Sequence, residues 1–104
     1  SQDDKLVLVE YYAPWCGYCQ KLAPKYQELA EHYQGNKDVI IAQFDATTND
    51  LVAPVVVSGY PTLVLWKNGE PKIYYGENEV EDIKAFIEEE LKGMKKPESV
   101  KDDL

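Results

Sequence analysis

The stretch LVLVEYYAPWCGYC, residues 6–19, joins an apolar strand pattern to two cysteines that are separated by two residues. Residues 6–13 form an almost continuous aliphatic and aromatic run, which predicts a central strand buried on both faces. Over residues 17–34 the apolar side chains recur at helical spacing. We therefore expect Cys16 at the junction of a strand and a helix, with Cys19 one turn inside the helix.

Length and charge exclude several classes of protein. The chain has 104 residues, of which 44% are hydrophobic, so it can build one domain with a modest core. Its 19 acidic residues outnumber 11 lysines, it has no arginine, and its net charge is −8. These charges disfavour nucleic acid and anionic membrane as partners. The sequence shows neither a membrane-spanning apolar run nor a signal-peptide pattern, so we expect a protein that acts where it is made or a piece of a longer one.

Two further regions of the sequence have strand patterns. Residues 39–45 (VIIAQFD) predict a second buried strand. Residues 62–75 contain two strand segments joined by Asn68-Gly69, a dipeptide that favours a tight hairpin turn. One parallel crossover and one hairpin predict an α/β fold with a mixed four-stranded sheet. We expect helices on both faces of this sheet.

The remaining segments predict a short helix or turn over residues 47–54 and a longer helix over residues 79–92. Asn78 and Glu81 have the spacing of a capping box at the start of that longer helix, and Gly93 is expected to end it. The expected organisation is a linker, one catalytic domain and a charged tail ending in KDDL, at residues 1–5, 6–92 and 93–104 respectively.

The expected position of Cys16 favours redox chemistry. Unpaired N–H groups and the positive end of the helix dipole stabilise a thiolate at a helix N-terminus. Cys19, expected to be less exposed, is placed to release a mixed disulfide formed at Cys16. Gly17 is expected to allow a tight turn, and Trp15 to supply an apolar edge beside the reactive sulfur.

Structural and metal-binding roles fit the two cysteines less well. A disulfide closing so short a loop adds little stability. A zinc site requires four ligands, and the only histidine is His32. Two inert buried cysteines remain an alternative, but C-x-x-C opening a helix in a βαβ context is a redox signal. We expect no metal and no cofactor beyond the Cys16–Cys19 redox pair itself.

Four short motifs closely resemble the thioredoxin-like catalytic domains of protein disulfide isomerases. They are APWCGYC, the KLAP that follows it, FDAT after the second predicted strand, and GYPT before the hairpin. The resemblance covers about residues 6–92 and implies a thioredoxin fold. It implies that Cys16 attacks disulfides and that Cys19 resolves the mixed disulfide. It also implies that a loop with a cis proline faces the cysteines and binds substrate backbone, formed by Tyr60, Pro61 and Thr62.

Glu10 is the only charged residue in the first predicted strand. A buried carboxylate without a partner is costly, so one interpretation is a side chain that reaches solvent at the end of the strand. The other is a buried proton acceptor beneath the active site, which takes the proton of Cys19. The resemblance favours the second interpretation, because family members carry a glutamate at this position.

The sequence departs from the family at three positions. It has Tyr18 where histidine is usual, Gln43 where many members have lysine, and Asn78 where many have arginine. Tyrosine cannot act as a cation, so we expect the pKa of Cys16 to be lowered less, by about one unit, and the redox couple to be more reducing. With Gln43 in place of a cation, we expect burial to raise the pKa of Glu10 toward neutrality.

Larger family members begin with a strand and a helix that this sequence lacks, which suggests a piece from the C-terminal end of a longer isomerase with a CGYC site, of fungal or protist type. Residues 39–44 would then form an exposed apolar sheet edge, lowering stability or favouring self-association. The KDDL at residues 101–104 is close to endoplasmic reticulum retrieval signals, so we expect the lumen of that compartment.

These features predict a thiol–disulfide oxidoreductase, of the protein disulfide isomerase type, that forms, reduces and rearranges disulfides in folding proteins. The expected partners are unfolded or misfolded cysteine-containing proteins and an upstream thiol oxidase or glutathione. Trp15, Tyr18 and Tyr60 could supply an apolar platform for such chains. The alternatives are a thioredoxin-like general protein disulfide reductase and a non-catalytic chaperone-like module.

Overall fold

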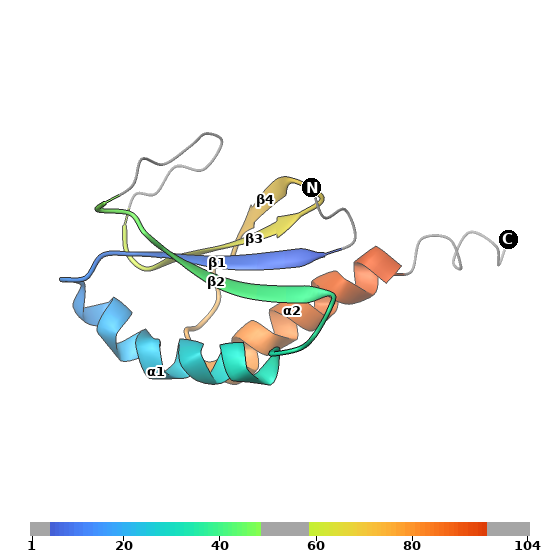
Figure 1. Ribbon diagram of the computed structural model, residues 1–104, viewed down its shortest axis with the longest axis horizontal. Coiled ribbons are helices and arrows are strands. Elements are labelled where there is room, and N and C mark those ends of the chain that lie inside the picture. Colours follow the sequence, from blue (N-terminus) through green and yellow to red (C-terminus); the bar gives the residue numbers. More distant parts are fainter. Residues whose placement is uncertain (1–4, 49–58, 96–104) are drawn as a thin grey trace, which may run out of the picture.

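The computed structural model describes residues 5–48 and 59–95 of the chain. All the predicted strands and both long helices are present in these residues (Figure 1). In chain order the elements are β1 (Leu6–Tyr12), α1 (Gly17–His32), β2 (Val39–Asp45), β3 (Thr62–Lys67), β4 (Glu70–Ile73) and α2 (Val80–Lys95).

The four strands form one mixed sheet in the order β2-β1-β3-β4. Strand β1 pairs in parallel with β2 and antiparallel with β3, so it occupies a central position, as predicted. Strands β3 and β4 form the predicted hairpin. Asn68 and Gly69 have φ angles of 53° and 81°, the left-handed values that a tight hairpin turn of this kind requires.

Both helices lie on the same face of the sheet, and the main core fills the space between them and the strands (Figure 1). We expected helices on both faces; the short helix predicted over residues 47–54 falls mostly outside the described residues, so that part of the expectation stays a prediction. The opposite face carries a smaller apolar cluster around Tyr11 and Val64. Because side chains alternate along a strand, Leu6, Leu8 and Glu10 of β1 all point to the helix-covered face.

Tyr26 fastens α1 to the sheet. Its hydroxyl lies 2.6 Å from the carbonyl oxygen of Ala42 on β2 and 3.1 Å from that of Leu8 on β1. Burial is the main cause that raises the pKa of Tyr26 far above its ordinary value, so the phenol stays protonated. This hydroxyl holds α1 against the parallel strand pair close to Glu10.

The ends of the helices differ from the prediction by a few residues. The first amide bond of α2 runs from Ile83 N–H to Glu79 carbonyl at 3.0 Å, so the capping position is Glu79 and not Asn78. The helix also continues through Gly93 to Lys95. A helical glycine costs only about 1 kcal/mol relative to alanine, and Leu91 and Met94 on either side pack against the core.

The segment after α1 also differs in detail. The helix ends at His32, two residues earlier than expected, and Gly35 adopts a left-handed φ of 82° in the turn that follows. Of the predicted short helix or turn over residues 47–54, residues 47 and 48 form a turn and the others lie outside the described residues. The charged tail, from residue 96 onward, also lies outside them.

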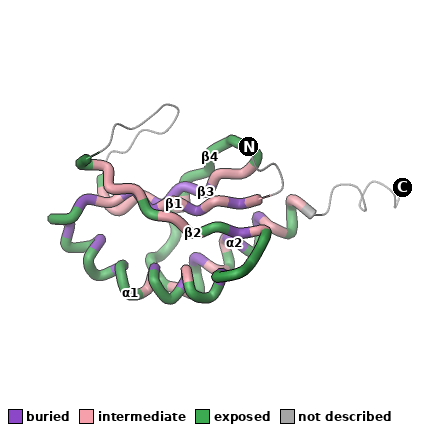
Figure 2. The backbone as a smooth tube through the Cα atoms, viewed as in Figure 1, coloured by how far each residue is buried: buried purple, intermediate pink, exposed green. Residues whose placement is uncertain are grey.

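Strand β2 forms one edge of the sheet, as expected. Its pattern of burial is mixed, with intermediate and exposed positions along the strand (Figure 2). Ile40 is 42% exposed. The other edge, β4, is exposed along its whole length but carries Pro71 and charged residues, which discourage further strand pairing. The two edges thus differ in how well their sequences guard against association.

Candidate active site

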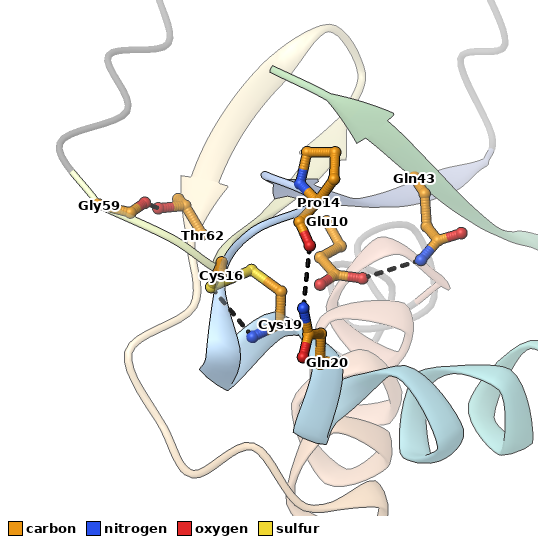
Figure 3. Close-up of a disulfide and its surroundings, with 8 residues drawn as sticks. All are labelled: Glu10, Pro14, Cys16, Cys19, Gln20, Gln43, Gly59 and Thr62. Carbon is orange, nitrogen blue, oxygen red and sulfur yellow. Dashed lines mark hydrogen bonds between the residues drawn. A yellow bond between two sulfur atoms is a disulfide. The ribbon is translucent and has the colours of Figure 1, made fainter. Parts of the chain in front are cut away.

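Cys16 and Cys19 form a disulfide at the start of α1 (Figure 3). Their Cα atoms are 5.2 Å apart, and Cys16 is the N-cap residue of the helix. The backbone N–H of Cys19 donates a hydrogen bond of 3.0 Å to Cys16 Sγ. A sulfur in this position accepts from a free helix N–H and faces the positive end of the helix dipole, which favours negative charge on it.

Two expectations about the cysteine motif were wrong. In the disulfide form Cys16 and Cys19 are each 6% exposed, so Cys16 is no more exposed than Cys19. Tyr60 packs against the pair and covers it in part. Gly17 is the first helical residue, has no left-handed φ, and a Cβ there would meet nothing within 4 Å. The turn before α1 is instead closed by a 3.1 Å bond from Cys16 N–H to the Ala13 carbonyl.

Aromatic residues lie close to the disulfide in sequence and in space. Trp15 and Tyr18, on either side of Cys16 in the sequence, are each 71% exposed, although both are large and partly apolar. The Trp15 ring makes an edge contact with the ring of Tyr60, with centroids 5.8 Å apart. Lys21 Nζ lies 5.7 Å from the centroid of Tyr18, close enough for a cation–π contact. The structure therefore brings two of the predicted site residues, Trp15 and Tyr60, into contact beside the disulfide.

The segment of residues 59–62 lies beside the disulfide, on the side away from Gln43 (Figure 3). The Tyr60–Pro61 peptide bond is cis. Thr62 Oγ1 donates a 2.6 Å hydrogen bond to the Gly59 carbonyl oxygen, which closes the turn around the proline. Tyr60 packs against the buried cluster of Ala13, Cys16 and Cys19, so this segment lies beside the cysteine pair.

Glu10 lies on the inner side of β1 and is 1% exposed. Its register partner on β2 is Gln43, whose Nε2 donates a 3.1 Å hydrogen bond to Glu10 Oε1 (Figure 3). Burial raises the pKa of Glu10, and the hydrogen bond from Gln43 offsets part of that rise. The carboxyl group therefore does not reach solvent at the strand end, and its partner is neutral.

A cavity of about 200 Å³ joins Glu10 to Cys19. It has room for water, and polar groups line it from several elements. Its lining residues are Glu10, Tyr12, Ala13, Pro14, Cys19, Gln20, Ala23 and Gln43. A carboxyl group and a thiol that share a small cavity with room for water can exchange a proton directly or through one water.

Sequence reasoning missed Gln20, which lines this cavity and donates a 3.0 Å hydrogen bond from Nε2 to the Pro14 carbonyl. Nothing in the spacing of the sequence marks this residue, since it is an exposed glutamine on a polar helix. Asn78, where many family members have arginine, is exposed in the loop before α2. An ion pair between Lys25 Nζ and Glu79 at 2.9 Å ties that loop to α1.

Residues 5–48 and 59–95 contain no group of three or more histidine, cysteine, aspartate or glutamate side chains placed to hold a metal ion. In the same ranges, neither helix has the length and apolar character needed to cross a membrane. His32, the only histidine in the sequence, makes an edge contact with Tyr33 at a centroid distance of 4.7 Å.

The thioredoxin family model matches residues 1–89 of this chain. The chain belongs to the thioredoxin family. This thioredoxin domain is 51% identical over 89 residues to protein disulfide-isomerase of Saccharomyces cerevisiae, covering 82% of this chain and 17% of the relative. It is 40% identical over 117 aligned positions to protein disulfide-isomerase A3 of Gallus gallus, covering 100% of this chain and 23% of that one. It therefore spans less than a quarter of either relative.

Solved structures agree with this assignment. The first thioredoxin domain of mouse protein disulfide-isomerase A4 matches with a TM-score of 0.76 and 37% identity, over 86% of this chain and 65% of that one. Human ERp44 matches with a TM-score of 0.76 and 28% identity, over 86% of this chain and 28% of that one. The expected thioredoxin fold, with a mixed four-stranded sheet, is confirmed.

Proposed function

We propose that this thioredoxin domain is a thiol–disulfide oxidoreductase of the protein disulfide isomerase type. The observation that carries the proposal is the Cys16–Cys19 pair at the N-terminus of α1, where a backbone N–H already bonds to Cys16 Sγ. The high identity to protein disulfide-isomerases supports it. The redox centre consists of the two cysteines, and the reaction needs no added cofactor.

In the reductive direction, the Cys16 thiolate attacks a substrate disulfide, forms a mixed disulfide and releases one substrate thiolate. Cys19 then loses its proton and attacks Cys16 Sγ, which forms the Cys16–Cys19 disulfide and releases the second substrate thiolate. The substrate gains two electrons and the domain loses two. The reverse sequence oxidises a substrate dithiol, and attack of a substrate thiol on the mixed disulfide rearranges the substrate.

We assign Glu10 as the proton acceptor for Cys19 in the resolving step. The shared cavity and the buried, neutral setting of the carboxyl group support this role. An acceptor works best when its pKa lies near the working pH, and burial moves the pKa of Glu10 in that direction. Gln43 orients the carboxyl group and adds no charge that would return its pKa to the ordinary range.

Substrate backbone is proposed to lie against residues 60–62, beside Cys16, while Trp15 and Tyr18 supply exposed apolar surface for unfolded chains. Tyr18 offers no cation to the thiolate, so the couple should be more reducing than in a relative with histidine at this position. About 30 mV in potential corresponds to 1.4 kcal/mol.

The proposed partners are unfolded or misfolded proteins with cysteines and, upstream, a thiol oxidase or glutathione. We propose that the domain works in the lumen of the endoplasmic reticulum, as a catalytic unit of residues 6–92 from the C-terminal part of a longer isomerase with a CGYC site. The identity to protein disulfide-isomerases supports this placement, as does the likeness of the KDDL at residues 101–104 to endoplasmic reticulum retrieval signals.

The test is reactivation of a scrambled multi-disulfide protein, compared with reduction of insulin by the same preparation. The proposal expects reactivation that is lost in Cys16→Ser, together with a redox potential of the Cys16–Cys19 pair in the oxidising range. Insulin reduction without reactivation would identify a general disulfide reductase instead. Suppression of aggregation that survives in Cys16→Ser would show an additional chaperone-like activity.

A further inference from the structure

Gln20 lines the cavity that joins Cys19 to Glu10 and lies at its solvent-exposed side. It follows Cys19 on α1 and is exposed, yet it also lines the cavity. Its Nε2 donates a 3.0 Å hydrogen bond to the carbonyl oxygen of Pro14, in the turn that leads to Cys16. Figure 3 shows the side chain reaching from the helix toward Pro14, with the Glu10 carboxyl group beside it. The amide thus bridges the helix and the turn at the edge of the cavity.

The groups around Glu10 are almost all neutral. From α1 it faces Cys19, Gln20 and Tyr26, whose buried phenol stays protonated. From β2 it faces Gln43, and on β3 its register partner is Leu63. Among the described residues, no lysine and no second carboxylate lines the cavity. Position 20 is therefore a place, besides position 43, where a change of side chain would bring charge to the lining of the cavity.

We propose that Gln20 is a positioning residue of the resolving step, which holds an uncharged side chain across the mouth of the cavity and so keeps the Glu10 carboxyl group desolvated and free of cations. This inference rests on the proposed role of Glu10 as the proton acceptor. The bond to Pro14 fixes the amide in place. The absence of charge on the Gln20 side chain, and not only its shape, affects the pKa of Glu10.

The charge at position 20 then controls the protonation of Glu10. A lysine there would favour the carboxylate and lower the pKa of Glu10, while a glutamate would raise it. An alanine would open the cavity to bulk water and lower it by a smaller amount, because solvation favours the charged form. A purely structural role for Gln20 predicts no such dependence on the sign of the charge.

The experiment titrates the Glu10 carboxyl group by carbon-detected NMR in the oxidised full chain, where neither cysteine ionises. The variants are Gln20→Lys, Gln20→Glu and Gln20→Ala. We expect the midpoint to fall by about half a pH unit or more with lysine, to rise with glutamate, and to fall slightly with alanine. Gln34→Lys and Gln34→Glu, in the exposed turn that follows α1, carry the same charge changes and should leave the midpoint unchanged.

Midpoints that ignore the sign of the charge at position 20, or that respond equally at position 34, would overturn the proposal. A second measurement follows the resolving step in single turnovers across pH. Its midpoint should move with that of Glu10 in Gln20→Lys. If the NMR midpoint moves and the kinetic one does not, the placement of Gln20 stands and Glu10 is not the proton acceptor.

Discussion

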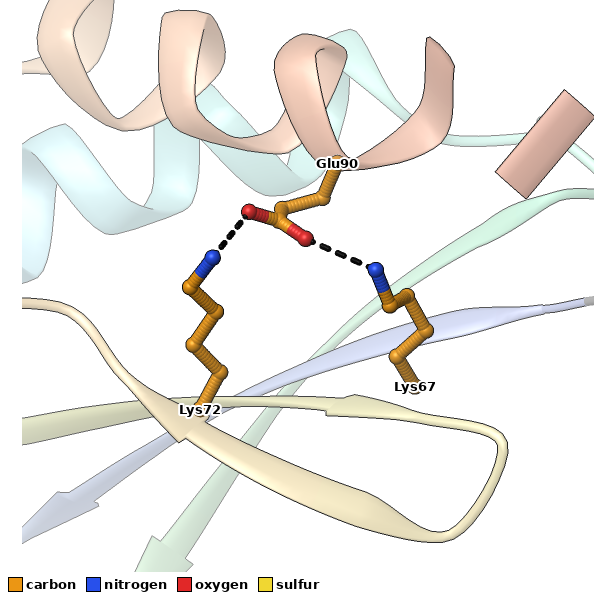
Figure 4. Close-up of polar contacts among 3 residues, drawn as sticks. All are labelled: Lys67, Lys72 and Glu90. Atoms are coloured by element: carbon orange, nitrogen blue, oxygen red, sulfur yellow. Dashed lines mark hydrogen bonds and ion pairs between the residues drawn. The ribbon is translucent and has the colours of Figure 1, made fainter. Parts of the chain in front are cut away.

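The molecule contains two buried glutamates that are treated in opposite ways. Glu10 on β1 is 1% exposed and is bonded to the neutral amide of Gln43. Glu90 on α2 is 9% exposed and bonds to Lys72 at 2.6 Å and to Lys67 at 3.0 Å (Figure 4). Burial raises the pKa of Glu10, whereas hydrogen bonds from Lys72 and then Lys67 lower the pKa of Glu90.

The difference between them lies in the partner. Two cations hold Glu90 in its charged form, where it fastens α2 to the hairpin of β3 and β4. A neutral partner leaves the pKa of Glu10 raised by burial, which is the direction that suits a group proposed to accept and return protons. The charge of the partner thus decides in which direction the pKa of each glutamate moves.

The largest expected effect comes from Glu10→Gln, which removes the proton acceptor and keeps the shape of the side chain. We expect resolution of the mixed disulfide to slow by about 100-fold, in line with general-base catalysis, while the first attack by Cys16 changes little. Rapid-quench measurement of the two steps checks this. Glu90→Gln is the matched control and should leave both steps unchanged; equal slowing of both steps in Glu10→Gln would mean that Glu10 is only structural.

The second effect is on stability and falls on the other glutamate. Glu90→Gln removes two charge-assisted hydrogen bonds, and we expect a loss of about 1 kcal/mol, since both lysines are well exposed and screened. Glu10→Gln should be neutral or slightly stabilising at pH 7, because it removes a carboxyl group whose charged form is disfavoured by burial and whose hydrogen-bond partner is neutral. Urea denaturation of the three proteins measures both values, and a greater loss in Glu10→Gln would reverse the comparison.

The third test gives Glu10 the kind of partner that Glu90 has. Gln43→Lys places a cation beside the carboxyl group, so the pKa of Glu10 should fall. The pH midpoint of the resolving step should then move down by about one unit. Gln43→Met removes the hydrogen bond without adding charge and should move the midpoint up. Unchanged pH midpoints in both variants would show that Gln43 does not influence the resolving step.

The smallest effect is on how stability depends on pH. The pKa of a glutamate in the unfolded chain is about 4.3, and the pKa of Glu10 in the folded protein is higher. The contribution of Glu10 to the free energy of unfolding is therefore full below about pH 4.3 and is lost as the pH rises through the folded pKa. The pKa of Glu90 in the folded protein is lower than in the unfolded chain. Its contribution to the free energy of unfolding is therefore present above about pH 4.3 and is lost as the pH falls through the folded pKa. Free energies of unfolding measured from pH 3 to 8 check this. The decrease in stability with rising pH that Glu10 causes should be absent in Glu10→Gln, and the decrease with falling pH that Glu90 causes should be absent in Glu90→Gln.

Much of the fold could be predicted because its signals are local. The apolar run over residues 6–13, the Asn68-Gly69 turn and the C-x-x-C spacing each specify a strand, a hairpin and a helix start within a few residues. The errors were of two kinds. Gly93 lies inside α2 because packing of its neighbours outweighs its low helix propensity. Cys16 is no more exposed than Cys19, because Tyr60, from a segment far away in the chain, packs against the pair.

The sequence by itself determined the chemistry: two cysteines at a strand–helix junction, and a single carboxylate in the strand that precedes them. Only the tertiary structure decided how the carboxylate is used. The register of β1 with β2 sets Gln43 against Glu10, and the packing of α1 brings Cys19 and Gln20 around the same cavity. The reason is physical, because desolvation and neutral partners act through distances between segments that are far apart in the chain.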